Sequence, residues 1–130
     1  MSRNRIPKTM PKEDYLAALH WCLRYPQWEK ELAVMPDPSR AIRYDQDRVQ
    51  SSGDYDSTYE LAVTRLEIES KKTLLEEIVR SVDSTLYDYL IMGVAYGFTY
   101  YQLRDKGIPC GRRQYYERRQ AIYQKVAKKI

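Results

Sequence analysis

The fifteen residues KGIPCGRRQYYERRQ (106–120) hold the densest group of chemically capable side chains in this sequence. One cysteine, four arginines and two tyrosines surround a short glycine-proline segment. Three kinds of site use such residues: a reactive thiol, a glycine-bearing loop that cradles a phosphate, and a basic helix that enters a nucleic-acid groove. The rest of the sequence distinguishes between these three.

Catalytic and metal-binding patterns are missing from the sequence. Cys22 and Cys110 each stand alone, and the single His20 has no acidic or nucleophilic partner in a recognised arrangement. Two cysteines and one histidine do not supply a zinc site at usable spacing. No Walker loop, dinucleotide fingerprint or Ser/His/Asp pattern occurs. We therefore expect no enzymatic activity, no cofactor and no metal, and we interpret both cysteines as small buried or half-buried residues.

The distribution of charge favours a polyanionic partner. The chain has 130 residues and a net charge of +4, a length that suits one domain with one core. Residues 104–130 hold nine Lys or Arg against two acidic residues, whereas residues 13–103 hold nine basic and sixteen acidic ones. The N-terminal stretch adds Arg3, Arg5, Lys8 and Lys12. Positive charge gathered at both ends favours nucleic acid over a membrane surface as the partner.

Neither a membrane span nor a secretion signal is expected. No apolar run approaches the roughly 18 residues that cross a bilayer. The basic N-terminal segment lacks the apolar stretch of a signal peptide. These two observations predict a cytoplasmic protein without membrane contact.

The N-terminal part predicts helices followed by a long connection. A first helix is expected to begin near Lys12, and Pro26 should break or kink it before helix resumes over 27–35. The apolar stripe of this first helix is expected to comprise Leu16, Leu19 and Leu23. Residues 36–56 are rich in proline, serine and aspartate, which predicts a mobile connection with a short helical turn near 40–44.

The longest helix is expected to follow this connection. Ser57 is a good N-cap and Glu60 stands three residues later, the spacing of a capping box. Apolar residues then recur mostly every three or four positions up to Val82. A helix of about 25 residues spans roughly 38 Å. Because this exceeds the usual length in globular proteins, we expect a partner helix or a second copy of the chain to cover it.

The C-terminal part predicts a shorter apolar helix and then two helices joined by a tight turn. Asp83 or Ser84 should cap the apolar helix and Gly97 should end it. Thr99 and Gln102 have capping-box spacing for a short helix over 100–106. The predicted turn has Gly107 in the left-handed conformation, Ile108 in the core, Pro109 against continuation of the helix, and Cys110 as cap of the last helix.

Two helices joined by a glycine-containing turn, with arginines in the second, are typical of a DNA-binding helix-turn-helix. One face of the second helix, with Tyr115, Ile122 and Val126, is expected to pack against the helix before the motif and against Leu103. The residues expected to approach bases are Arg112, Arg113, Gln114 and Tyr116. Those expected to hold phosphates are Thr99, Tyr100, Arg118, Arg119, Lys125, Lys128 and Lys129. Most tyrosines are expected in the core, with Tyr100 and Tyr116 as exceptions.

The segment YGFTYYQLRDKGIPCGRRQYYERRQ resembles the promoter-reading helix-turn-helix (region 4) of bacterial sigma factors. The matching positions are Gly97, Thr99, Gln102, Leu103 and Cys110. Two features depart from that pattern: Arg104 replaces the usual small alanine, and the glycine of the turn comes one residue early.

The segments IPCGRRQYYERRQ and VQSSGDYDSTYELAVTR are also similar to phage and prophage regulators of the RinA and ArpU type, over roughly residues 50–130. This resemblance implies an all-α domain with a long central helix, DNA binding through the last helix, contact with RNA polymerase, and a place at the nucleoid of a bacterial host. It further implies activation of phage late or packaging genes.

Two other functions remain open from the sequence. A small terminase subunit also combines a helix-turn-helix with oligomerising helices, and would serve DNA packaging rather than transcription. The second open function is that of a helical protein-interaction module, whose basic C-terminal segment would only keep it soluble.

Overall fold

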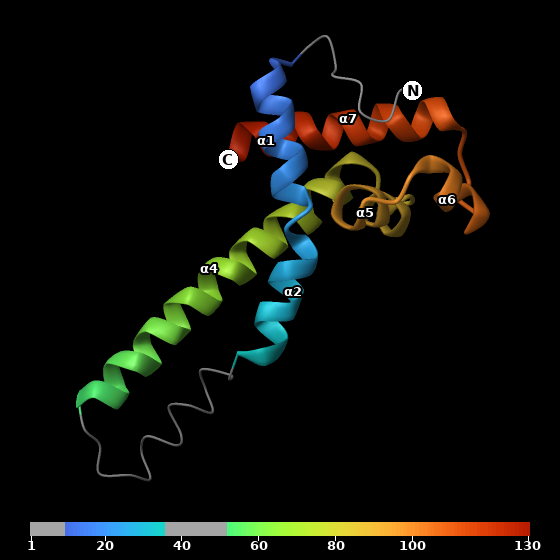
Figure 1. Ribbon diagram of the computed structural model, residues 1–130. Helices are drawn as coiled ribbons and strands as arrows, with labels where there is room; N and C mark the ends of the chain where they lie inside the picture. The colour runs from blue at the N-terminus through green and yellow to red at the C-terminus, as the bar shows by residue number, and fades with distance from the viewer. Residues whose placement is uncertain (1–9, 36–51) are drawn as a thin grey trace. The chain divides into compact units, whose positions relative to one another are not determined.

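The computed structural model describes residues 10–35 and 52–130, and within these residues every regular element is a helix. The predicted all-α class is thereby confirmed. The helices are α1 (Lys12–Cys22), α2 (Tyr25–Val34), α4 (Ser52–Val82), α5 (Tyr87–Tyr96), α6 (Tyr100–Asp105) and α7 (Arg112–Lys129) (Figure 1). The helical turn expected near 40–44, most of the predicted connection, and the basic residues Arg3, Arg5 and Lys8 lie outside the described residues.

The chain forms two compact units. The first comprises Met1–Pro26 and Leu74–Ile130, and it therefore combines α1 with the last turns of α4 and with α5, α6 and α7. The second comprises Gln27–Thr73, which holds most of α2 and the greater part of α4. The two regions that the sequence suggests, an N-terminal region over 1–56 and a helix-turn-helix region over 57–130, stay a prediction.

The break between α1 and α2 occurs where the proline predicts it. The N–H of Leu23 donates to the Leu19 carbonyl at 3.2 Å, which closes α1. Pro26 is the second residue of α2. In the first turn of a helix the absent N–H of proline removes no intrahelical hydrogen bond, so Pro26 begins a new helix rather than distorting the old one.

The buried face of α1 differs from the prediction. Leu16 and Leu23 are 36% and 42% exposed, so the leucine stripe is not the core face. The buried residues are Tyr15, Ala18 and Cys22. They lie on the side of α1 that packs against α7, where the Tyr15 and Tyr123 rings meet edge to face at 5.4 Å. Figure 1 shows α1 crossing α7. Small side chains such as Ala18 allow two helices to approach closely, which leucine would prevent.

The start of α4 is also different. The helix begins at Ser52, so Ser57 lies inside it and is not its N-cap. Residues 52–56, which we expected to belong to the connection, are helical. The sequence places Asp54 and Asp56 here, and acidic residue types are favoured near the positive end of a helix dipole.

In the second unit, Arg65 of α4 bonds the end of α2. Its Nη1 donates to the Leu32 and Met35 carbonyls at 3.2 and 3.4 Å, and its Nε lies 3.5 Å from Glu69. The last carbonyls of a helix have no intrahelical partner, so a guanidinium that donates hydrogen bonds to them stabilises the helix end.

Candidate nucleic-acid interface

The entry to α6 is fixed by two local signals that the sequence predicts. Gly97 ends α5 in the left-handed conformation at φ 76°. Thr99 then caps α6: its Oγ1 accepts from the Gln102 N–H at 3.3 Å, and its own N–H donates to Gln102 Oε1 at 2.8 Å. This reciprocal pair is the predicted capping box, and it occupies the Thr99 hydroxyl in positioning α6.

The turn after α6 forms as predicted. Gly107 adopts φ 96°, and its N–H donates to the Arg104 carbonyl at 3.0 Å. The N–H of Ile108 donates to the Leu103 carbonyl at 3.1 Å, which completes a Schellman motif. Both Leu103 and Ile108 are buried, so the turn is fastened to the core by its own apolar residue.

Two expectations for this turn are wrong. Gly111, not Cys110, is the N-cap of α7, and it offers no side-chain cap. The Cys110 carbonyl instead accepts a hydrogen bond from the Tyr100 hydroxyl at 2.9 Å. Tyr100 is only 8% exposed and its ring contacts that of Tyr115. Tyr100 therefore ties α6 to the turn from inside and is not presented to a phosphate or a base.

Neither cysteine is activated. Burial raises the pKa of the Cys22 thiol to about 12. Burial also raises the pKa of the half-buried Cys110 thiol, and the negative Asp83 adds to the effect. Because the thiolate is the nucleophile, both shifts oppose reactivity, in agreement with the structural role expected for these residues.

The first turn of α7 is an exposed polar surface. Arg112, Arg113 and Gln114 are all exposed, and the first turn of this helix contains no acidic residue. The Arg113 side chain is 94% exposed and lies 3.7 Å from Glu117 one turn later. The Arg112 guanidinium lies over the half-buried Tyr116 ring at 5.4 Å. Of the four residues expected to approach bases, Arg112, Arg113 and Gln114 are thus exposed on this first turn. Tyr116 is half-buried, and its ring meets the buried Tyr115 ring edge to face at 5.1 Å.

The later residues of α7 form its buried side, as expected. Tyr115, Ile122 and Val126 are fully buried. α7 packs against α5 as predicted, and also against α1, which sequence reasoning did not assign to it. The spacing of apolar residues along α1 shows that it is a helix but not which element it packs against. The contact between α1 and α7 joins residues far apart in the chain, so the sequence does not indicate it.

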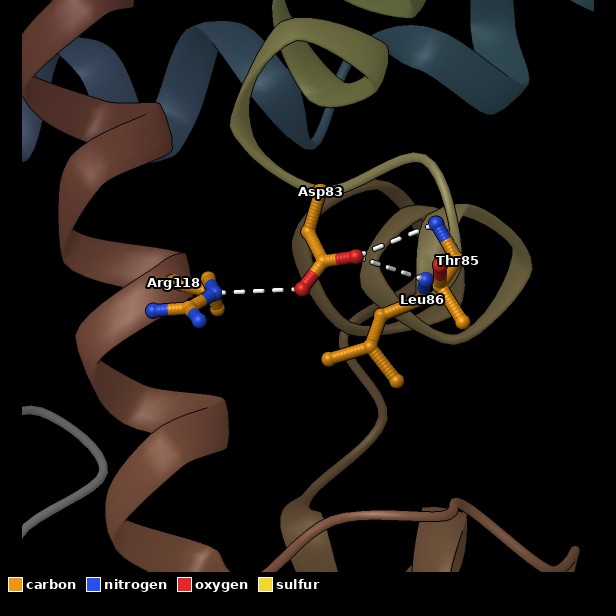
Figure 2. Close-up of polar contacts among 4 residues, drawn as sticks. All are labelled: Asp83, Thr85, Leu86 and Arg118. Atoms are coloured by element: carbon orange, nitrogen blue, oxygen red, sulfur yellow. Dashed lines mark hydrogen bonds and ion pairs between the residues drawn. The ribbon is translucent and has the colours of Figure 1, made fainter.

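Arg118 makes an ion pair within the protein. Its Nε donates to Asp83 Oδ2 at 3.1 Å, while Asp83 Oδ1 accepts from the N–H groups of Thr85 and Leu86 at 3.0 and 3.2 Å (Figure 2). Asp83 therefore caps the turn that leads into α5, as the sequence suggested, although Leu86 is the N-cap residue itself. Arg118 joins α7 to this turn, a role different from the phosphate contact expected for it.

The charge on Asp83 is stabilised by these contacts. Burial by itself would raise the pKa of this carboxyl, but the hydrogen bonds from Arg118 and from the N–H groups of Leu86 and Thr85 prevail and lower it below its ordinary value. A carboxyl whose pKa is lowered in the folded state stabilises the fold above its unfolded pKa, and this contribution disappears as the pH falls through the folded pKa.

Replacing Asp83 by asparagine should therefore destabilise the protein by about 1 kcal/mol at pH 7, the scale of a partly solvent-screened hydrogen bond to a charged group. The difference in unfolding free energy between the wild-type protein and this variant should be largest above the ordinary aspartate pKa of about 3.9. It should shrink as the pH falls below that value. Urea unfolding at pH 7 and at pH 2.5 measures it. Asp105→Asn, at an exposed position at the end of α6, is the matched control and should not destabilise. An Asp83→Asn deficit of equal size at both pH values would contradict this explanation.

Arg119 and Lys125 also contact the protein itself. The Arg119 Nε donates to the Tyr123 hydroxyl at 3.0 Å, and its guanidinium lies 5.6 and 5.5 Å from the centres of the Tyr116 and Tyr123 rings. Lys125 is exposed, and its Nζ donates to Ser81 Oγ at 2.9 Å. From the sequence we expected both residues to bind phosphates, because the sequence of a basic helix does not indicate which of its cations contact other parts of the protein.

The described helices include none that is both long and apolar enough to cross a membrane. Within 10–35 and 52–130, no three or more His, Cys, Asp or Glu residues are grouped so as to hold a metal ion. Comparisons with protein-family models, with curated proteins and with solved structures find no match to this chain.

Proposed function

We propose that this chain binds duplex DNA sequence-specifically through the first turn of α7 and that it regulates transcription. The observation that supports this proposal best is the exposed set Arg112, Arg113 and Gln114 at the start of a helix whose other side is buried. Two cations at a helix N-terminus oppose the dipole, at a cost of about 0.3–1 kcal/mol each. A polyanion bound at this end offsets that cost.

The arrangement suits entry into the major groove. In a helix-turn-helix, the first residues of the second helix contact base edges while the preceding helix faces the backbone. Arginine bonds the O6 and N7 atoms of guanine, and glutamine bonds the N6 and N7 atoms of adenine. The Tyr116 ring beneath Arg112 restricts that guanidinium before DNA arrives. The exposed Lys128 and Lys129, at the other end of α7, suit phosphate contacts that position the helix.

The more specific function is proposed from two resemblances: that of 96–120 to sigma region 4, and that of 49–65 and 108–120 to the RinA and ArpU type of regulator. On this basis we propose that the chain activates phage or prophage late or packaging genes in a bacterial cytoplasm, with RNA polymerase as a protein partner. The two positive-φ glycines and the capping box of α6 agree with such a motif.

The test is binding to the DNA that flanks the gene and its neighbouring operon, measured by fluorescence anisotropy over a range of salt concentrations. We expect at least ~10³-fold preference for one site over scrambled DNA, with affinity that falls steeply with salt. Affinity independent of sequence and of salt would refute the proposal.

A packaging role like that of a small terminase subunit is the second candidate, because α4 has an apolar face. Tyr59, Val63 and Leu66 lie four and three residues apart on this helix and are 66%, 38% and 63% exposed. Residues at this spacing share one side of a helix. Light scattering coupled to size exclusion separates the two: a monomer or dimer that binds one site supports the regulator, and a stable ring supports the packaging protein.

A further inference from the structure

A cavity of about 240 Å³ lies in the unit that holds α1, α5 and α7. The side chains of Leu19, Leu23 and Phe98 provide apolar wall, and Thr99, Arg119 and Tyr123 provide the polar groups. None of the three residues that begin α7 contributes to it. The cavity is therefore separate from the surface proposed to contact bases.

Arg119 is the charged group of this cavity, and its charge has no carboxylate partner among the described residues. The residue is half-buried. A guanidinium has five N–H donors, and here one of them, on Nε, is used by the Tyr123 hydroxyl. The central carbon of its guanidinium lies 5.6 and 5.5 Å from the centres of the Tyr116 and Tyr123 rings. A guanidinium keeps its positive charge, and its remaining N–H donors suit an anionic ligand.

We propose that this cavity binds a small organic anion, a carboxylate carried on a compact apolar body. The carboxylate accepts hydrogen bonds from the Nη groups of Arg119, the side-by-side geometry that guanidinium and carboxylate share. The apolar body then lies against Leu19, Leu23 and Phe98. With about 30 Å³ for each water of the liquid, the volume suits a ligand of roughly ten non-hydrogen atoms.

A DNA phosphate fits this cavity less well. The phosphodiester backbone is strongly hydrated and continuous, whereas half of the wall named here is leucine and phenylalanine. Burying a polar group against apolar surface costs free energy unless every polar atom is bonded. A ligand with one anionic end and one apolar end matches the cavity, which offers the Arg119 guanidinium and an apolar wall.

Binding of such a ligand is expected to stabilise the packing of this unit. The cavity is lined by α1, by the segment between α5 and α6, and by α7, so an occupant contacts all three. A ligand that binds the folded state alone raises the melting temperature by mass action. This effect needs no DNA, so the inference stands or falls independently of the proposed function.

The experiment uses the full chain labelled with ¹⁵N and titrated with phenylacetate, with phenylacetamide and benzylamine as neutral and cationic analogues. We expect saturable shifts of the Arg119 side-chain Nε–H and of the Phe98 and Thr99 amides at millimolar phenylacetate. Phenylacetamide should bind at least tenfold more weakly, and benzylamine should cause no shift at these groups. Arg119→Gln should weaken phenylacetate binding at least tenfold, whereas Arg113→Gln, at an exposed position of the same helix, should leave it unchanged.

A second variant covers the case in which Arg119→Gln does not fold. Leu23→Trp places a large ring at the cavity wall from a position that is 42% exposed, so the core is left intact while the cavity is filled. It should abolish the phenylacetate shifts with the helical circular dichroism preserved. The inference is overturned if phenylacetate, benzoate and isovalerate all leave these three groups unshifted at 20 mM, if phenylacetamide binds as well as phenylacetate, or if duplex DNA displaces the bound carboxylate by direct competition at Arg119.

Discussion

Replacing Arg112 and Arg113 together by alanine should abolish sequence-specific DNA binding and leave the fold intact. Both side chains are exposed at the start of α7, with Arg112 over the half-buried Tyr116 ring and Arg113 beside Glu117. A bidentate arginine–guanine contact contributes about 1–3 kcal/mol of discrimination. Losing two of them predicts a decrease of roughly 30-fold to 10⁴-fold in affinity for the preferred site. Anisotropy with the preferred and a scrambled duplex measures the loss.

The double arginine variant is not expected to be less stable than the wild-type protein. Because the two cations oppose the helix dipole, their removal should leave the melting temperature unchanged or raise it slightly. The matched control is Lys128→Ala with Lys129→Ala, which removes the same charge from the other end of α7. That control should weaken binding to all sequences alike and reduce the slope of log affinity against log salt by about 2. If the arginine variant keeps its preference for one site, the first turn of α7 is not the surface that contacts bases.

Gly93→Ala should be the most damaging addition of a single methyl group in this unit. A Cβ at Gly93 would lie 1.8 Å from the Tyr115 hydroxyl oxygen and 3.0 Å from its Cζ. Tyr115 is fully buried on α7, so its ring must shift within the packed unit to make room. Overpacking of this kind costs about 1–3 kcal/mol, which corresponds to a fall of roughly 4–12 °C in melting temperature. Thermal and urea unfolding measure it.

A second substitution identifies the cause of that loss. The Tyr115 hydroxyl has no hydrogen-bond partner of good geometry among the described residues, although the nearby positive Arg119 opposes the burial that raises its pKa to about 12. Tyr115→Phe alone should therefore cost little. Combined with Gly93→Ala it should restore at least about 1 kcal/mol relative to the sum of the two single effects.

The control for the glycine substitution is Gly111→Ala. A Cβ at Gly111 meets no atom within 4 Å, and the backbone there has φ −79°. An alanine N-cap costs no more than about 1 kcal/mol relative to glycine. Strictly additive effects of Gly93→Ala and Tyr115→Phe would show that the close approach of α5 and α7 at this point does not determine stability.

The features that the sequence predicts well are those set by neighbours along the chain. The capping box of Thr99 and Gln102, the left-handed Gly107 and the buried Ile108 each depend on residues within one turn. Their residue types have strong local preferences, so the boundaries of α5, α6 and α7 follow closely from the sequence.

The features that the sequence does not predict depend on contacts between distant residues. Arg118 and Asp83 are thirty-five positions apart, and neither residue type indicates the other. The face of α1 is decided by its contact with α7, where Tyr15 meets Tyr123 and the leucines are left at the surface. Propensity and spacing define a helix, but the element that covers it is decided by tertiary packing.

The arginines of 106–120 consequently divide by position along α7. Arg112 and Arg113 lie on its exposed first turn, whereas Arg118 and Arg119 lie one turn or more further and contact Asp83 and Tyr123. We expected the second pair to hold DNA phosphates. In the structure that pair contacts the protein itself, and the contacts to bases are proposed for the start of the helix.

The most direct test of the central claim is an NMR titration of the ¹⁵N-labelled chain with a duplex that contains its preferred site. We expect the largest shifts at the amides of 112–116 and at the side-chain Nε–H groups of Arg112 and Arg113, while the Nε–H of Arg118 stays at its position. Shifts centred on 125–129 or on the second unit, with the first turn of α7 unchanged, would contradict it.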